Sequence, residues 1–213
     1  MTAARLIIWR HGRTAWNATG RFQGQADIPL DEVGRGQAAA AAPRIAALGP
    51  TAIVASDLSR AAETADALAR VTGLTVTYDR RLREIDVGSW EGLTVATVEQ
   101  QDPGHVHDHH LGADFRRSAT GETAGEVADR VAAALTEIVG AADDDAVVVA
   151  VMHGLAGRVG MARFLDLEPN RFGGMRNCGW INLERHRLGH WLVREYNATA
   201  PETGMPAPED RVA

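Results

Sequence analysis

The sequence contains no lysine, so all 22 of its basic residues are arginines. This absence excludes catalysis through a lysine Schiff base, and it excludes the P-loop, whose lysine contacts the phosphates of a nucleotide. Any anion that the protein binds must therefore be held by arginine, histidine, backbone amides or a metal ion.

Cysteine and long apolar segments are also scarce. The single cysteine, Cys178, cannot form an internal disulfide and lacks the spacing of a zinc site, so we expect a small, buried apolar side chain. No segment has the length of a membrane-spanning helix, and the first residues lack the apolar stretch of a signal peptide. These features predict a cytoplasmic protein without a membrane partner.

The charge of the chain is acidic overall but basic near its start. A formal net charge of −6 argues against nucleic acid as a partner. Residues 1–26 nevertheless contain four arginines and neither aspartate nor glutamate. This bias is either a fluctuation in an arginine-rich sequence or the mark of a pocket for an anion.

Apolar runs alternate along the chain with alanine-rich or amphipathic stretches. The expected strands are 5–9, 52–55, 74–77, 146–151, 177–184 and 190–196, and the expected helices are 31–48, 59–72, 123–140 and 154–165. This order predicts an α/β fold with a mainly parallel central sheet and helices on both faces. We expect one domain over residues 1–197, followed by a mobile, proline-rich tail over 198–213.

Polar residues follow several of these strands. Arg10 and His11 end the first strand, Arg60 follows the second, Glu84 follows the third and His153 follows the run 146–151. The carboxyl ends of parallel strands meet at one edge of a sheet, where α/β proteins bind ligands. Two arginines, two histidines and a carboxylate suit phosphoryl transfer: arginine matches phosphate oxygens, imidazole can act as the nucleophile, and a carboxylic acid can protonate the leaving oxygen.

Five segments resemble the histidine phosphatase superfamily, which has the phosphoglycerate-mutase-like fold. They occur in the family's order and cover residues 5 to about 165: Arg10-His11-Gly12-Arg13-Thr14-Ala15-Trp16-Asn17, Gly20-Arg21-Phe22-Gln23-Gly24, Ser56-Asp57-Leu58-Ser59-Arg60-Ala61, Leu82-Arg83-Glu84 with Gly88, and His153-Gly154. The resemblance implies a three-layer αβα fold with a small cap insertion and a homodimer.

The resemblance also implies roles for particular residues. His11 would form a phosphohistidine, while Arg10, Arg60 and His153 would neutralise the phosphoryl oxygens. Glu84 would protonate the leaving oxygen and then activate a water molecule. Hydrogen bonds to phosphate or substrate would come from further residues of the motifs, namely Asn17, Gln23 and Gly24. No metal or other cofactor is implied, because arginine and imidazolium neutralise the phosphate.

The cap corresponds to residues 102–122, which contain four histidines at positions 105, 107, 109 and 110. One interpretation is a metal site, because histidine is the commonest metal ligand. The other, which we favour, is a variable loop that sets substrate preference. At its end the family's G-E-S motif stands as Gly121-Glu122-Thr123.

The sequence resembles the phosphatase branch of the superfamily more than the mutases, because Glu84 and His153 are separated by a short segment and the mutase pattern around the acid is absent. Further segments resemble actinobacterial phosphatases that act on glucosyl-3-phosphoglycerate: Gly173-Gly174-Met175, Asn177, Trp180 and Tyr196-Asn197-Ala198-Thr199. We therefore expect a metal-independent phosphomonoesterase acting on a small phosphorylated metabolite, with glucosyl-3-phosphoglycerate or a related sugar or acid phosphate as the expected substrate. The alternatives are a phosphoglycerate mutase, a housekeeping phosphatase of broad specificity, and an inactive module that binds a phosphorylated ligand.

Overall fold

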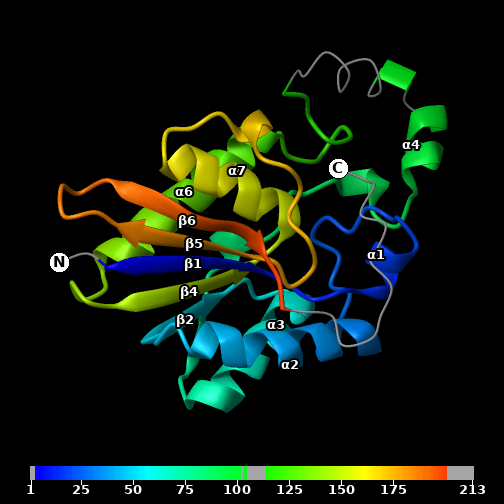
Figure 1. Ribbon diagram of the computed structural model, residues 1–213. Coiled ribbons are helices and arrows are strands. Elements are labelled where there is room, and N and C mark those ends of the chain that lie inside the picture. Colours follow the sequence, from blue (N-terminus) through cyan, green and yellow to red (C-terminus); the bar gives the residue numbers. More distant parts are fainter. Residues whose placement is uncertain (1–2, 102, 105–113, 201–213) are drawn as a thin grey trace.

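A six-stranded sheet forms the centre of the protein in the computed structural model, which describes residues 3–101, 103–104 and 114–200 (Figure 1). The strand order is β3-β2-β4-β1-β5-β6. The strands are β1 (Arg5–Arg10), β2 (Ala52–Ala55), β3 (Val76–Tyr78), β4 (Val147–Met152), β5 (Trp180–Arg185) and β6 (Trp191–Ala198). The first four in the sheet order pair in parallel, and β5 pairs antiparallel with both β1 and β6.

Helices cover both faces of this sheet. Along β1, Leu6 and Ile8 point to one face and pack with α6 (Ala124–Gly140) and α7 (Gly154–Phe164). Ile7 and Trp9 point to the other face and pack with α2 (Glu32–Ala46) and α3 (Ser59–Thr72). The alternation follows from the two-residue period of a strand that is buried on both faces. The predicted three-layer αβα architecture is confirmed, and Figure 1 shows the two helical layers on opposite sides of the sheet.

The ends of the long helices are set by local hydrogen bonds. Asp31 caps α2 by accepting a hydrogen bond from the amide of Gly34. Thr123 and Glu126 form a capping box at the start of α6, in which each side chain bonds the backbone of the other residue. Gly73 ends α3 in the left-handed conformation, with φ 74°. The predicted helix starts at residues 31 and 123 therefore coincide with helix caps, and the predicted end at residue 72 lies directly before the glycine that ends α3.

The structure shifts some predicted boundaries and adds short elements. The third strand begins at Val76 instead of residue 74, and the fifth begins at Trp180 instead of residue 177, because Cys178 has φ 53° in a turn. Strand β6 extends to Ala198, the first residue of the expected tail. Short elements without a clear apolar period were missed: α1 (Ala15–Ala18), η1 (Arg80–Leu82), η2 (Gly88–Trp90), α4 (Val95–Gln101) and η3 (Pro169–Arg171).

Two of the sequence expectations fall on parts of the chain outside the described residues. The four histidines of the segment 102–122 lie there, as do residues 201–213 of the expected tail. Within the described part of the chain, no helix is long and apolar enough to cross a membrane.

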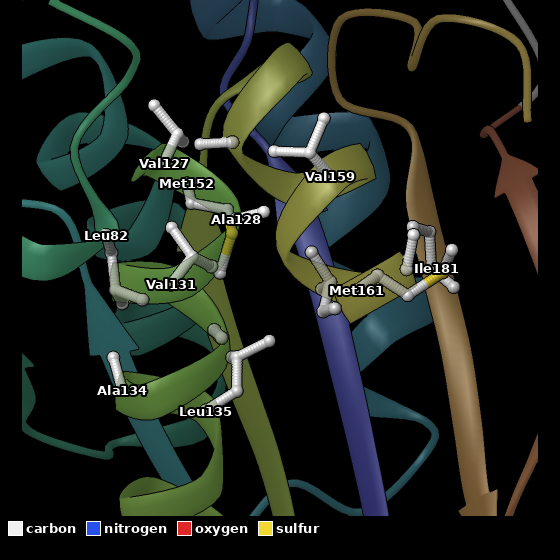
Figure 2. Packing of buried hydrophobic residues seen from close by; sticks show 14 of the residues in the cluster. Leu82, Val127, Ala128, Val131, Ala134, Leu135, Met152, Val159, Met161 and Ile181 are labelled. Atoms are coloured by element: carbon white, nitrogen blue, oxygen red, sulfur yellow. The ribbon is translucent and has the colours of Figure 1, made fainter. Parts of the chain in front are cut away.

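A close contact between α6 and α7 depends on a glycine. A Cβ atom built on Gly160 would lie 2.2 Å from Cγ1 of Val131 and 2.7 Å from its Cβ. Figure 2 shows Val131 on α6 in the same apolar cluster as Val159 and Met161 on α7. We predict that Gly160→Ala lowers the free energy of unfolding by about 1–3 kcal/mol, because overpacking outweighs the helix propensity of alanine.

The control for this prediction is Gly36→Ala on α2. Gly36 is exposed, and a Cβ there would meet no atom within 4 Å. This substitution should raise the free energy of unfolding by up to about 1 kcal/mol. Urea denaturation of both variants measures the difference, and a Gly160→Ala protein that gains stability as Gly36→Ala does would contradict the close packing of α6 and α7.

Candidate active site

The first candidate residue, His11, directly follows β1 and is 2% exposed. Its Nδ1 lies 2.7 Å from the carbonyl oxygen of Gly12. A carbonyl oxygen only accepts hydrogen bonds, so Nδ1 must carry the proton and donate it. In the neutral ring this leaves Nε2 with a free electron pair.

The surroundings of His11 favour that neutral ring. Burial lowers the pKa of His11 well below its usual 6.5, and the positive charges of Arg60 and Arg10 lower it further. The hydrogen bond to Gly12 acts in the opposite direction but is the smallest of these effects. His11 is therefore an uncharged imidazole whose Nε2 has the electronic state of a nucleophile.

The position of His11 is fixed by a backbone contact behind it. A Cβ on Gly12 would lie 2.4 Å from the carbonyl oxygen of Gly34, and a Cβ on Gly34 would lie 2.0 Å from that of Arg13. Two glycines thus allow the segment after His11 to touch the first turn of α2. The hydroxyl of Thr64 on α3 accepts a hydrogen bond from the Gly12 amide at 3.1 Å. Glycine is required in the motif for this close approach.

Arg60, on the first turn of α3, has no exposed surface. Its guanidinium donates to the carbonyl oxygens of Gly24 and Ala26, both at 2.8 Å, and to Nδ1 of His153 at 3.2 Å. Burial lowers the pKa of Arg60 to about 10, so the group keeps its positive charge at neutral pH. Among the described residues, these bonds use three of its five N–H donors.

His153 follows β4 and is fully buried, with its ring centroid 5.1 Å from that of His11. Its Nδ1 accepts from Arg60, so its proton lies on Nε2, which donates to the hydroxyl of Ser56 at 2.9 Å. Burial, followed by the charge of Arg60, lowers the pKa of His153 well below 6.5. His153 is therefore a neutral donor in this structure, and the positive charge expected of it comes from the arginines.

Arg10 projects from the end of β1 toward a loop before β5. One of its terminal nitrogens donates to the carbonyl oxygen of Met175. The loop is held in turn by Asn197 of β6, whose side chain accepts from the Arg176 amide at 2.7 Å and donates to the Gly174 carbonyl at 2.9 Å. The segments 173–175 and 196–199, noted in the sequence, are thus in contact, and they support Arg10.

Glu84 lies just after η1, in the segment that follows β3. Its carboxyl group accepts hydrogen bonds from the amides of Leu155 at 3.2 Å, Ala156 at 2.9 Å and Ile85 at 3.0 Å. The first two donors belong to the N-terminal turn of α7, directly after His153. The start of α7 therefore holds Glu84 next to the buried histidines and arginines.

The three predicted binding residues lie between β1 and α2, with Asn17 on α1 and Gln23 and Gly24 on the loop that follows it. Asn17 accepts from the amide of Thr14 at 3.1 Å, and Gln23 accepts from the Thr14 hydroxyl at 2.9 Å. Gly24 contributes its carbonyl oxygen to Arg60. The hydrogen bonds described above therefore place all eight predicted site residues around the carboxyl ends of β1 and β4.

Sequence reasoning assigned no role to several polar residues that the structure brings into the site. Ser56 bonds His153, Thr64 bonds Gly12, and Asn177 donates to the carbonyl oxygen of His11 at 3.3 Å and to the side chain of Asn17 at 3.2 Å. Ser56 lies inside the motif around Arg60, which was the available signal, and Thr64 follows the end of that motif by three residues. The described residues contain no group of three or more histidine, cysteine or carboxylate side chains that fits a metal ion.

Because His11 and His153 are neutral and buried, the stability of the protein depends on pH. Below pH 6.5 the unfolded chain binds protons at these residues that the folded protein does not bind. We therefore predict that the free energy of unfolding falls as pH decreases from 6.5 to 5, by up to about 1.4 kcal/mol per pH unit for each histidine. Urea denaturation at several pH values measures this slope, and His11→Asn should reduce it; an equal slope in both proteins would contradict the neutral state of His11.

The comparisons with known proteins show the family to which the chain belongs. The sequence profile of the histidine phosphatase superfamily (branch 1) matches residues 6–199. The chain is 39% identical over 206 residues to glucosyl-3-phosphoglycerate phosphatase of Mycobacterium tuberculosis strain H37Rv, covering 90% of this chain and 88% of the relative. It is 34% identical over 191 residues to a protein of Salmonella paratyphi C named "Probable phosphoglycerate mutase GpmB", covering 89% and 88% of the two chains.

A solved structure has the same fold. The mycobacterial glucosyl-3-phosphoglycerate phosphatase in complex with VO3 superposes with a TM-score of 0.85 at 38% sequence identity, covering 92% of this chain and all of that one. The family profile, the similar sequences and the similar structure all indicate the same superfamily. The chain therefore belongs to the histidine phosphatase superfamily, branch 1, and is an enzyme of the phosphatase class.

Proposed function

We propose that the protein hydrolyses phosphate monoesters through a phosphohistidine on His11, without a metal ion. The observation that carries this proposal is the hydrogen bond from Nδ1 of His11 to the Gly12 carbonyl, which leaves Nε2 unprotonated beside Arg10 and Arg60. A nucleophile needs a free electron pair, and a phosphate dianion needs positive charge around it. Both requirements are met in one buried region.

In the first step, Nε2 of His11 attacks the phosphorus atom, and the bond between phosphorus and the ester oxygen breaks. The leaving oxygen takes a proton from the carboxyl group of Glu84. Arg10 and Arg60 hold the phosphoryl oxygens, and His153, whose N–H group donates to Ser56, orients Arg60 by accepting a hydrogen bond from its Nε. Asn17, Gln23 and Gly24 shape the pocket and orient the substrate. The N–H···O bond from His11 to Gly12 favours the positive charge that the ring acquires on phosphorylation.

In the second step, water attacks the phosphorus atom of the phosphohistidine. The carboxylate of Glu84 takes the proton from that water, the bond from phosphorus to nitrogen breaks, and Nε2 regains its electron pair. Glu84 thereby returns to its protonated form, because it acts as an acid in the first step and as a base in the second. The products are an alcohol and inorganic phosphate.

Glucosyl-3-phosphoglycerate is the substrate that we propose. The mycobacterial relatives carry this compound in their names, and their identity of 39–40% spans nearly the full chain. A second candidate function is phosphoglycerate mutation, which the relative named as a mutase supports at 34% identity. A homodimer and a cytoplasmic location stay predictions that follow from the family and the sequence.

The reaction class has a direct test. We predict that the purified protein hydrolyses p-nitrophenyl phosphate with the same rate before and after treatment with a chelator, because arginines supply the charge that a metal would supply. His11→Ala should abolish turnover and the acid-labile phosphate that denaturation traps on the protein. Loss of activity on chelation, or full activity in His11→Ala, would contradict the mechanism.

The substrate requires a comparison among phosphorylated metabolites. We predict that kcat/KM for glucosyl-3-phosphoglycerate exceeds that for other sugar and acid phosphates by about 100-fold, which corresponds to about 2.7 kcal/mol of differential transition-state binding. Equal values would indicate a phosphatase of broad specificity. Interconversion of phosphoglycerates that depends on a bisphosphorylated primer would indicate a mutase, and binding without turnover would indicate an inactive module.

A further inference from the structure

Arg130 on α6 contacts the backbone of the segment that carries Glu84. All five N–H groups of its guanidinium donate hydrogen bonds. Its Nε and one Nη2 proton bind the carboxylate of Glu122 at 2.8 and 2.7 Å. Its Nη1 donates to the carbonyl oxygens of Arg81 at 2.8 Å and Arg83 at 2.7 Å. The remaining Nη2 proton goes to the carbonyl oxygen of Glu84 at 2.9 Å. One side chain therefore fixes three carbonyl groups within four consecutive residues.

Glu122 completes this arrangement. Its carboxylate orients the guanidinium of Arg130 side-on and accepts a hydrogen bond from the amide of Asp86 at 2.9 Å. Burial raises the pKa of Glu122, but the hydrogen bonds from Arg130 and Asp86 outweigh it, so that the net pKa is lowered and the group is ionised at neutral pH. The pair thus holds the backbone on both sides of Glu84.

The side chain of Glu84 is held from a different direction. Its carboxyl group is bound by amides at the start of α7, whereas its carbonyl group is bound by Arg130 on α6. The adjacent Arg83 forms a two-fold hydrogen-bonded ion pair with Asp57, with both distances 2.6 Å. Since a proton donor must lie within hydrogen-bond reach of the leaving oxygen, small shifts of this segment have large effects on the rate.

We infer that Arg130 is a positioning residue for the proton donor, which places the backbone of residues 81–84 so that the carboxyl group of Glu84 meets the leaving oxygen. This inference rests on the proposed role of Glu84. Arg130 acts through Glu84 and does not contact the substrate. Lysine cannot replace it, because an ammonium group has three donors at one point instead of a planar fork with five.

Two substrates with different leaving groups can distinguish a role of Arg130 in positioning Glu84 from a role in the stability of the fold. An alkoxide leaves poorly and needs a proton, whereas p-nitrophenolate is stable as an anion and leaves without one. A badly placed Glu84 therefore slows the phosphorylation step for glycerol phosphate far more than for p-nitrophenyl phosphate. Loss of folded protein lowers kcat/KM for both substrates by the same factor. The ratio of the two values is independent of the folded fraction.

The experiment compares this ratio among the wild type, Arg130→Lys, Glu122→Gln and Glu84→Gln. We expect Arg130→Lys to lower kcat/KM for glycerol phosphate by about tenfold or more relative to p-nitrophenyl phosphate, with a smaller change of the same direction in Glu122→Gln. The control is Arg163→Lys, because Arg163 on α7 forms an exposed ion pair with Asp129 on α6 at 3.2 Å and touches none of residues 81–84. Its ratio should equal that of the wild type.

The outcomes distinguish the role of Glu84 as the proton donor from the role of Arg130 in positioning it. Glu84→Gln should change the ratio by about 100-fold or more, and an unchanged ratio there would overturn the proposed proton donor itself. A changed ratio in Glu84→Gln with unchanged ratios in Arg130→Lys and Glu122→Gln would overturn the role of Arg130 alone. If Arg130→Lys does not fold, Glu122→Gln alone decides between these results.

Discussion

The guanidinium group of Arg60 carries a positive charge into a part of the protein that has no contact with solvent. Such a charge costs several kcal/mol to bury unless acceptors surround it. The carbonyl oxygens of Gly24 and Ala26 and one ring nitrogen of His153 supply these acceptors. The loop after β1, the start of α3 and the end of β4 must therefore keep fixed distances from one group. The same bond determines which nitrogen of His153 is protonated, and the charge of Arg60 adds to burial in lowering the pKa of both His11 and His153.

The main features of the fold were predictable because their causes are local. Strand β4 is a continuous apolar run, which is typical of a parallel strand buried on both faces. The helix ends at Gly73 and Thr123 follow from left-handed φ and from a capping box. Short elements such as α1 and α4 were not predicted, because fewer than two or three turns give no measurable apolar period. The late start of the fifth predicted strand has another reason: the φ of Cys178 is set in a turn whose amide donates to the carbonyl oxygen of His11, and cysteine does not signal such a φ.

The sequence could predict which residues lie together at the candidate site, but it could not predict their protonation states or the hydrogen bonds that hold them in place. His11, Arg60 and His153 follow strands whose carboxyl ends meet, so their proximity follows from topology. The neutral state of His153 follows from its burial and then from the 3.2 Å approach of Arg60, and no sequence pattern reveals either of them. The pair of Glu122 and Arg130 was also missed as a unit, because its partners are backbone carbonyl groups that every residue possesses. Contacts of side chains with backbone depend on the path of the chain and leave little trace in residue type.

The contacts of Asn197 have a consequence for how the protein is made. His11 is synthesised before β6, yet the loop that positions Arg10 is held by Asn197 of β6, nearly two hundred residues later in the sequence. Contacts between residues so distant in sequence form late, after most loop entropy has been lost. A chain still emerging from the ribosome therefore contains His11 before it has the support of Arg10. The arrangement around Arg10 is complete only when β6 joins the sheet.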